Sequence, residues 1–313
     1  MASSSVLPFS SSFRSWFHPC LASKITFTRR TNSLSIVTRS SLSDNSALLQ
    51  AAKHTVDSYV KSGMVVGFGA GHASDLAIHY LGQQLKAGAL KDIVGTPTCV
   101  GSASVAAKVG IPLEQYEGSS KIDVAFSDAD VIEEVTLSAI IGRRKMMGEE
   151  SIIQEKVSQF NLISCVRCSG YLSLQTILGA AEKLVFIVTE KQYRSDLDGS
   201  IPVLIQSFNW METAEEIDDL FLGDAEVWRR PSVGYAGPLG GDFPMVTKEG
   251  HNVLDVIFTS PIIILADVAN CLEQVDGVVE HGIICRIPCT AVIASENGLR
   301  IIDNNLILEA GRA

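Results

Sequence analysis

Apolar residues change their spacing several times along the chain. From residue 45 to 61 they recur at helical intervals, with Ser43 or Asp44 placed to cap the helix and Gly63 to end it. A short apolar run then leads into residues 62–74, where alternating glycines are followed by an amphipathic pattern. We therefore expect a helix, a strand, a tight turn and the start of a second helix.

The same order of elements is repeated further along the chain. Residues 91–95 predict a second strand, and small residues from about 102 to 109 predict the helix after it. Residues 110–113 close this unit, and residues 121–126 predict a third strand. Strands that alternate with helices favour an α/β fold with a parallel sheet, whose strands direct their carboxyl ends toward one ligand-binding edge.

The glycine turn is suited to binding an anion. Glycines let backbone N–H groups approach a ligand closely, and a helix N-terminus adds unpaired donors and a partial positive charge. A phosphate group fits these donors, although a helix that only packs tightly on its sheet would show the same glycines. Residues 72–74 lack the third glycine of the dinucleotide fingerprint, and no Gly-Lys-Ser/Thr follows. Neither a Rossmann dinucleotide loop nor a Walker loop is matched, and this opposes a nucleotide-dependent oxidoreductase.

Residues 1–43 differ in composition from the rest of the chain. They are rich in serine, contain no acidic residue before Asp44, and carry five basic residues. This composition is typical of an organelle transit peptide, and the richness in Ser and Thr favours a plastid over a mitochondrion. We therefore expect a disordered leader and a chloroplast location in the stroma, with an ordinary disordered tail as the alternative.

The remaining 270 or so residues of the 313 suffice for one large or two modest α/β domains. The whole chain has a net charge of −10, and the body without its basic leader is more acidic still. An acidic body argues against nucleic acid or an anionic membrane surface as a partner. The longest apolar stretches, such as residues 261–266, are too short to span a bilayer.

Two pairs among the seven cysteines have spacings that invite a metal or disulfide interpretation. Cys285 and Cys289 stand in a segment with the pattern of a buried strand, where a free cysteine behaves as a small apolar residue. We therefore expect no metal site there. Redox regulation through Cys165 and Cys168 is kept as a hypothesis that thiol titration under oxidant would test.

The third predicted strand ends in an acidic loop, residues 127–130, with Glu133 and Glu134 close behind. Carboxylates at this edge of a parallel sheet are candidates for proton transfer or for binding sugar hydroxyls. A solvated acidic loop is the alternative from these residues alone.

From about residue 45 to 303, the order of these blocks resembles the A-type ribose-5-phosphate isomerase family. The Gly-Phe-Gly-Ala-Gly of residues 67–71 resembles the family's Gly-x-Gly-Thr-Gly-Ser-Thr phosphate turn, and Ser-Asp-Ala-Asp at 127–130 stands where Asp-Gly-Ala-Asp-Glu is expected. The block from Thr98 to the Gly-Ile-Pro-Leu at 110–113, and further blocks at 185–191, 246–255 and 277–282, also match in order. Similarity in this order is more specific than any single motif.

This resemblance implies a Rossmann-like main domain with a parallel sheet, and a smaller α+β domain of ferredoxin-like type inserted late in the chain. The implied bounds are 44–198 plus 277–313 for the main domain and 199–276 for the inserted one. The resemblance also implies interconversion of ribose 5-phosphate and ribulose 5-phosphate without a metal or organic cofactor. Family members are commonly oligomeric, so the resemblance makes a homo-oligomer possible, although no residue of the sequence decides the oligomeric state.

The resemblance assigns site residues one by one. Asp130 would bind or polarise sugar hydroxyls, Lys191 matches the family's substrate-binding lysine, and Glu155 resembles its general base. If a gap is placed differently, the predicted helix 172–183 takes the position of the base, which becomes Leu174. The expected substrate-binding residues are Gly69, Ala70, Gly71, His72, Ala73, Thr98, Ser127, Asp128, Ala129, Gly142, Arg143 and Arg144.

Several of these positions depart from the family pattern. The phosphate turn has Ala70, His72 and Ala73 in place of hydroxyl side chains, so the hydroxyl donors are gone while the backbone donors remain. His72 could donate to a phosphate, and an exposed histidine with no role at the start of a helix is the alternative. The family's Lys-Gly-Gly-Gly becomes Ile-Gly-Arg-Arg at 141–144, where guanidinium groups could neutralise a phosphate or an enediolate. The departures leave a second interpretation, a relative that binds a sugar phosphate or a partner subunit without turnover.

Overall fold

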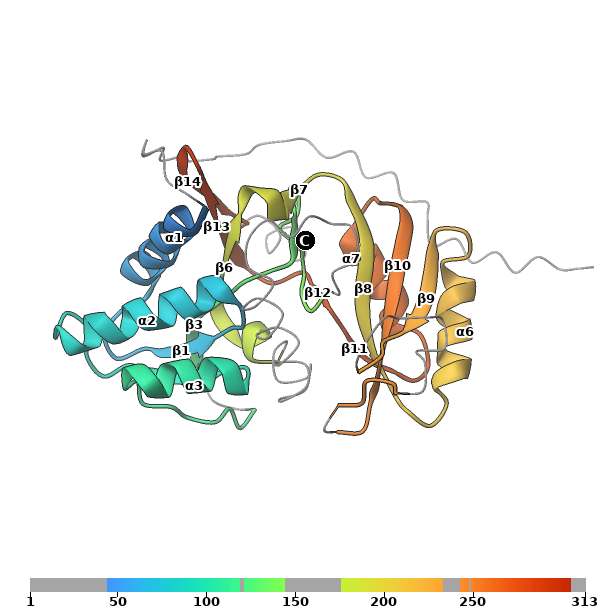
Figure 1. The fold of residues 1–313 in the computed structure, drawn as a ribbon, viewed down its shortest axis with the longest axis horizontal. Helices are drawn as coiled ribbons and strands as arrows, with labels where there is room; N and C mark the ends of the chain where they lie inside the picture. The colour runs from blue at the N-terminus through green and yellow to red at the C-terminus, as the bar shows by residue number, and fades with distance from the viewer. Residues whose placement is uncertain (1–43, 119–120, 144–175, 233–242, 248, 305–313) are drawn as a thin grey trace, which may run out of the picture. The chain divides into compact units, whose positions relative to one another are not determined.

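The computed structural model describes residues 44–118, 121–143, 176–232, 243–247 and 249–304 (Figure 1). The predicted leader and the Cys165 and Cys168 pair lie outside these residues. In the part of the chain that is described, no helix is both long and apolar enough to cross a membrane.

The first sheet described has six strands in the order β14-β13-β6-β3-β1-β2. In chain order its members are β1 (Val65–Phe68), β2 (Val94–Pro97), β3 (Ile122–Ser127), β6 (Ala181–Thr189), β13 (Cys289–Ser295) and β14 (Gly298–Asp303). All neighbours are parallel except β13 and β14, which are antiparallel. The α/β class with a parallel sheet, predicted from the alternating elements, is confirmed.

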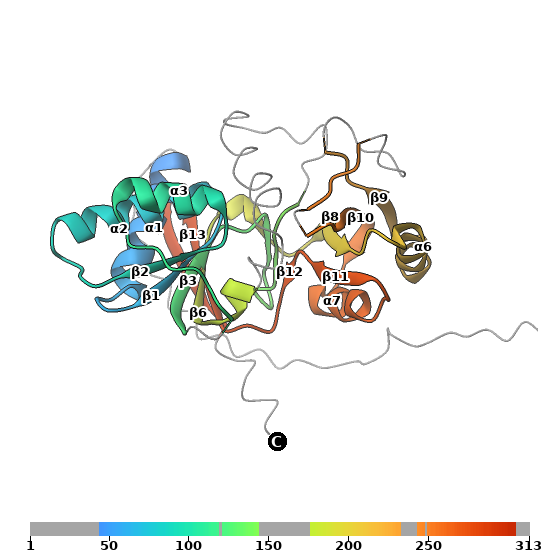
Figure 2. The same ribbon diagram turned by 90° about the horizontal axis from the view of Figure 1, so that it is seen from below.

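Three helices pack on one face of this sheet: α1 (Asp44–Tyr59), α2 (His72–Lys86) and α3 (Val100–Val109) (Figures 1 and 2). The strand side chains alternate between the two faces, as the pleat requires. In β6, Val185 and Ile187 join the core under the helices, whereas Leu184, Phe186 and Val188 face the opposite core. Both faces are therefore apolar, which explains the near-continuous hydrophobic run of this strand.

The second sheet is antiparallel, in the order β11-β8-β10-β9. Its elements follow the chain as β8 (Leu197–Ile205), α6 (Trp210–Leu220), β9 (Ala225–Arg229), β10 (Asn252–Ile262), α7 (Leu265–Glu273) and β11 (Val278–His281). The two helices share one apolar core with inward-facing residues of β8 and β10. This β-α-β-β-α-β order is the ferredoxin-like arrangement that the family resemblance implies.

A third, smaller sheet links the other two along the chain. It consists of β4 (Val131–Glu133), β5 (Ala139–Ile140), β7 (Tyr193–Arg194) and β12 (Ile283–Ile284), in the order β12-β5-β4-β7. A 3₁₀ helix, η1 (Glu190–Gln192), lies between β6 and β7. The chain leaves the first sheet after β6 and returns to it at β13. The exact domain boundaries stay a prediction.

Two predicted elements have different bounds in the structure. The second strand, expected over 91–95, begins at Val94 and runs to Pro97. Lys91 donates its amide to the Ser62 hydroxyl at 3.0 Å and Asp92 has a φ of 56°, so these residues form a turn instead of a strand. Pro97 is tolerated because β2 lies at the edge of the sheet.

The helix predicted over 172–183 is also corrected. Residues 176–179 are helical, but β6 begins at Ala181. The backbone of residues 181–185 pairs with β3, and this pairing overrides the helical pattern of the local sequence.

Candidate active site at the carboxyl edge of the sheet

The sheet has a topological switch point between β1 and β3. From β1 the chain passes to β2 on one side, and it then continues in β3 on the other side of β1. In open α/β sheets, ligands bind in the crevice at the carboxyl ends of such strands. The predicted glycine turn follows β1 and the predicted acidic loop follows β3. The structure therefore brings these two predicted segments together.

The turn and the loop approach each other closely because Gly69 has no side chain. Its amide donates to the carbonyl of Phe126 at 2.8 Å, and a Cβ atom at this position would lie 2.4 Å from the Cβ of Ser127. On the other side of the turn, the amide and hydroxyl of Thr98 both donate to the carbonyl of Phe68 at 2.9 Å. Thr98 and Ser127 are both buried. Thr98 thus holds the turn by hydrogen bonds, whereas Ser127 lies against Gly69 and donates its hydroxyl to the carbonyl of Asp128.

Asp128 fills the position that the sequence suggests for an anionic ligand. Its carboxylate accepts hydrogen bonds from the amide of Ala73 at 2.9 Å, and from the amide and hydroxyl of Ser74 at 2.7 Å each. Gly71 makes room for it, with a φ of 129° and a Cα whose Cβ would lie 2.2 Å from the Asp128 Cγ. Two amides of the first turn of α2 are therefore satisfied by a carboxylate of the chain itself.

Enclosure by protein changes the acidity of this carboxyl group. Desolvation is the main reason why the pKa of Asp128 is raised to about 7; the donors on Ser74 and Ala73 oppose this rise, and the charge of Asp75 adds to it. The group therefore titrates near neutral pH. Among the predicted residues of the turn, Ala70 and Ala73 are buried, and His72 is half-buried at the first position of α2.

Asp130 is held at the opposite end of the acidic loop. Its amide donates to the carbonyl of Ile140 at 2.9 Å, and its Oδ2 accepts a hydrogen bond from the amide of Arg143 at 2.8 Å. The loop between these residues is fixed by Ala129, which is buried and whose carbonyl accepts from the side chain of Gln192. Gln192 was not among the predicted residues. It ties the acidic loop to η1, which carries the exposed Lys191.

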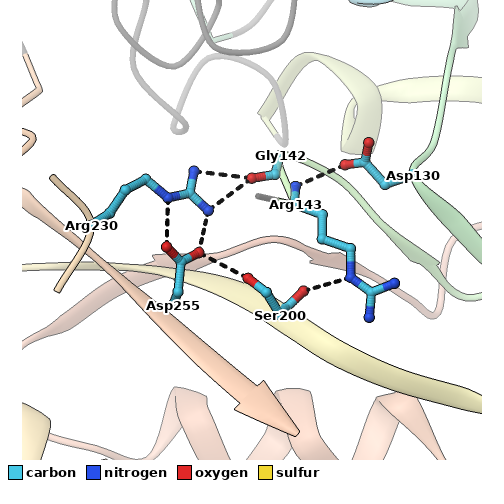
Figure 3. Close-up of polar contacts among 6 residues, drawn as sticks. All are labelled: Asp130, Gly142, Arg143, Ser200, Arg230 and Asp255. Atoms are coloured by element: carbon cyan, nitrogen blue, oxygen red, sulfur yellow. Dashed lines mark hydrogen bonds and ion pairs between the residues drawn. The ribbon is translucent and has the colours of Figure 1, made fainter. Parts of the chain in front are cut away.

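The segment at 141–143 differs from a free anion-binding loop. Ile141, which stands where the family pattern has a lysine, is 2% exposed and packs in the core behind the first sheet. Gly142 is buried, and its carbonyl accepts from both terminal nitrogens of Arg230 at 3.1 Å (Figure 3). The Nε of Arg143 donates to the carbonyl of Ser200 at 3.0 Å. This segment is therefore bonded to the second sheet.

Arg230, Asp255 and Ser200 complete this group of hydrogen-bonded residues, and the sequence does not predict them as site residues. Arg230 donates its Nε to Asp255 at 2.9 Å and a second nitrogen to the other carboxylate oxygen, and the hydroxyl of Ser200 donates to Asp255 at 2.9 Å. Arg230 is 7% exposed and Asp255 is 1% exposed. Charged residues that are buried in a fold are normally paired. The sequence around Arg230 does not show that its partner is Asp255.

Two predicted site residues, Glu155 and Arg144, lie outside the described residues, as does Leu174. The structure therefore describes Asp130 and Lys191 without the predicted base.

The pair Cys285 and Cys289 is described: Cys289 is buried in β13, and burial raises its pKa to about 12. Within the residues described, no group of three or more His, Cys, Asp or Glu is arranged to hold a metal ion.

The chain is an α/β protein with a glycine turn and an acidic loop at the switch point of its parallel sheet, which is the edge where proteins of this class bind small ligands. A family model described as ribose 5-phosphate isomerase A (phosphoriboisomerase A) matches residues 94–167 and 164–298. The chain belongs to this family.

Individual relatives agree with the family match. The chain is 30% identical over 258 residues to a probable ribose-5-phosphate isomerase 2 of Arabidopsis thaliana, covering 81% of this chain and 85% of that protein. It is 26% identical over 258 residues to a probable chloroplastic ribose-5-phosphate isomerase 3 of the same plant, covering 80% and 81%. A solved D-ribose-5-phosphate isomerase in complex with phospho-erythronic acid has a TM-score of 0.67 at 23% identity, covering 84% and 100%. The structural likeness confirms the α/β fold with a second, smaller domain.

Proposed function

We propose that the protein interconverts D-ribose 5-phosphate and D-ribulose 5-phosphate, the reaction for which its family is named. The observation that carries this proposal is the meeting of the glycine turn and the Asp130 loop at one switch point, in a chain of this family. An isomerase of this kind moves a proton between neighbouring carbons through an enediolate. It needs one carboxylate base, and donors or positive charge near the developing oxyanion.

The proposed roles follow the sequence assignments. Glu155 is the base that carries the proton between C1 and C2 of the sugar. Asp130, oriented by the Arg143 amide, accepts hydrogen bonds from sugar hydroxyls. Lys191, on the exposed side of η1, and Arg144 supply positive charge. No metal or organic cofactor enters these steps.

The phosphate of the substrate is proposed to bind at the glycine turn. The amides of Gly69 and Ala73 are engaged by Phe126 and Asp128, so the donors proposed for the phosphate are the backbone amides of Ala70 and Gly71, together with His72 at the start of α2. In this arrangement Asp128 lies next to the phosphate and does not bind the sugar.

The test is an assay of the purified full chain, and of a form lacking residues 1–43, with each of the two pentose phosphates. We expect interconversion by both forms and a loss of at least about a hundredfold in Glu155→Gln, since general-base removal has effects of this size. Glu149→Gln, which changes a carboxylate six residues earlier in the sequence, is the matched control and should keep its rate. Binding of ribose 5-phosphate in calorimetry without turnover would instead favour a relative that binds without catalysis.

We further propose a plastid location. The serine-rich, basic leader supports it, and so does the relative named chloroplastic. A fluorescent protein fused after residue 43 should enter chloroplasts of leaf cells, and the same fusion without the leader should stay in the cytosol. Cytosolic fluorescence of the leader fusion would contradict this proposal.

A further inference from the structure

We propose that Arg230 and Asp255 are positioning residues for Asp130, acting through the peptide bond between Gly142 and Arg143. The inference rests on the proposed function in so far as Asp130 contacts the sugar. Three contacts in series carry it: Asp255 holds Arg230, Arg230 holds the Gly142 carbonyl, and the Arg143 amide holds Asp130 (Figure 3).

The first step is the fixed direction of the Arg230 side chain. Its guanidinium is planar and presents its donors as a rigid fork. One edge of the fork meets the two oxygens of Asp255, and Asp255 is held in turn by the hydroxyl of Ser200 at 2.9 Å. The other edge, made by both terminal nitrogens, meets the carbonyl oxygen of Gly142 at 3.1 Å. The ion pair therefore sets where this carbonyl points.

The second step is the geometry of the peptide bond. The carbonyl of Gly142 and the amide of Arg143 belong to one planar trans peptide, so they point in opposite directions. When Arg230 attracts the oxygen, the N–H of the same peptide is directed to the other side, where it donates to Asp130 Oδ2 at 2.8 Å. A rotation of this peptide would break the bonds to Arg230 and Asp130 together. The φ of 74° at Gly142 shows that this conformation suits glycine.

The third step is the effect on Asp130. Its backbone is bonded to β5 through Ile140, and its carboxylate is oriented by the Arg143 amide. Small errors in the placement of a group that contacts substrate can cost on the order of a hundredfold in rate. Loss of the Arg230 fork should therefore reduce turnover, although Arg230 has no direct contact with Asp130 among the bonds described.

A purely structural role for the ion pair makes a different prediction. Arg230→Met leaves the carboxylate of Asp255 buried without its partner, and this destabilises a protein whatever its activity. The double variant Arg230→Met with Asp255→Leu removes both charges and should recover much of the lost melting temperature. If the pair only stabilises the fold, the double variant should also recover its rate. If it positions Asp130, the rate stays low.

The experiment compares Arg230→Met, Arg230→Lys and the double variant in the full-length chain. Arg229→Met is the matched control, because this neighbouring guanidinium lies over the Trp210 ring, 4.2 Å from its centroid, and not on Gly142. We expect kcat to fall at least about tenfold in the double variant measured below its melting temperature. The control should keep kcat within about twofold.

Hydrogen exchange of the Arg143 amide is measured on the same proteins and does not depend on activity. It should become faster in Arg230→Met and in the double variant, and stay unchanged in the Arg229→Met control. Unchanged exchange, or full recovery of kcat in the double variant, would overturn the positioning role. An unmodified chain without isomerase activity would overturn the proposed function instead, while the exchange measurement would still decide whether Arg230 holds the peptide.

Discussion

The carboxylate of Asp128 accepts two hydrogen bonds from Ser74, one from the amide and one from the hydroxyl, each 2.7 Å long. With the amide of Ala73 as a third donor, Asp128 caps α2 from a loop 54 residues further along the chain. The chain thus places its own anion at a helix terminus that the sequence suggests for a phosphate. The site is defined as much by this internal contact as by the glycines.

Removal of the Asp128 carboxylate should destabilise the protein. Asp128→Ala leaves two amides of α2 without their acceptor, and loss of a capping side chain costs about 0.5–2 kcal/mol. Urea unfolding of the full chain measures this loss. Asp75→Ala is the control, because it removes a carboxyl group from the same turn of α2 while the carboxylate of Asp128 keeps its three hydrogen bonds. Equal losses in the two variants would contradict a capping role for Asp128.

The same variant should bind phosphate more tightly. Without Asp128, the amides of Ala73 and Ser74 become available to an external anion at a helix terminus that favours negative charge. Titration with inorganic phosphate in a calorimeter should give a stronger affinity for Asp128→Ala than for the unmodified chain. A weaker affinity would mean that Asp128 helps to build the phosphate site instead of competing for its donors.

Because of Asp128, the free energy of unfolding should decrease as the pH rises from mildly acidic to mildly alkaline values. Its pKa in the folded protein is about 7, above the ordinary 3.8, so the folded state binds the proton more tightly than the unfolded state. The resulting stabilisation is complete below 3.8 and is lost as the pH rises through about 7. The contribution to the slope is at most about 1.4 kcal/mol per pH unit.

Asp128→Asn separates this contribution from those of other groups. The difference in unfolding free energy between this variant and the unmodified chain should change with pH, in favour of the variant on the alkaline side. Urea unfolding at a series of pH values measures it. A difference that is constant across the range would show that the Asp128 carboxyl does not titrate there.

Gly71→Ala should destabilise the protein more than the same substitution at a glycine with positive φ and open space around it. The new Cβ would meet Asp128 at 2.2 Å, and the backbone φ is 129°. Gly88→Ala is the matched control, since Gly88 has a φ of 74° and nothing within 4 Å of its Cβ position. The control should lose about 1 kcal/mol, whereas Gly71→Ala should lose at least about 2 kcal/mol. Similar losses would show that Asp128 can move aside.

Gln192 should matter for substrate binding although it carries no charge. Its side chain joins Ala129 of the acidic loop to Thr189 and so places η1 beside that loop. Gln192→Ala should raise KM for ribose 5-phosphate severalfold, because the position of Lys191 is then less fixed. Glu190→Gln, on the exposed first residue of η1, is the control. An unchanged KM in Gln192→Ala would exclude this role.

The sequence predicts the parts of the fold that local pattern determines. The strand, turn and helix around Gly69 follow from glycine spacing and hydrophobic period, and the structure confirms them. The predicted β2 begins three residues too early, because Lys91 is drawn into a turn by a hydrogen bond to Ser62. This contact spans 29 residues, so a local window does not contain it.

The side-chain directions within the site are harder to predict. The sequence predicts Asp128 as a substrate-binding residue, and this stays a prediction. The direction of its side chain depends on the adjacency of β1 and β3, which places Ser74 within its reach. The bond from Arg230 to Gly142 joins residues 88 apart and requires both the second and the third sheet. The sequence alone does not distinguish the polar residues of such pairs from polar residues at the surface, because their pairing depends on the folded structure.

The central claim is that the protein moves a proton between C1 and C2 of a pentose phosphate. The most direct measurement incubates the full-length chain with ribose 5-phosphate in D₂O and follows the sugar by NMR. We predict that ribulose 5-phosphate appears with deuterium from solvent at C1, and that Glu155→Gln forms it at least about a hundredfold more slowly. Absence of the ketose with the unmodified chain, in a sample that is folded by circular dichroism, would contradict the account.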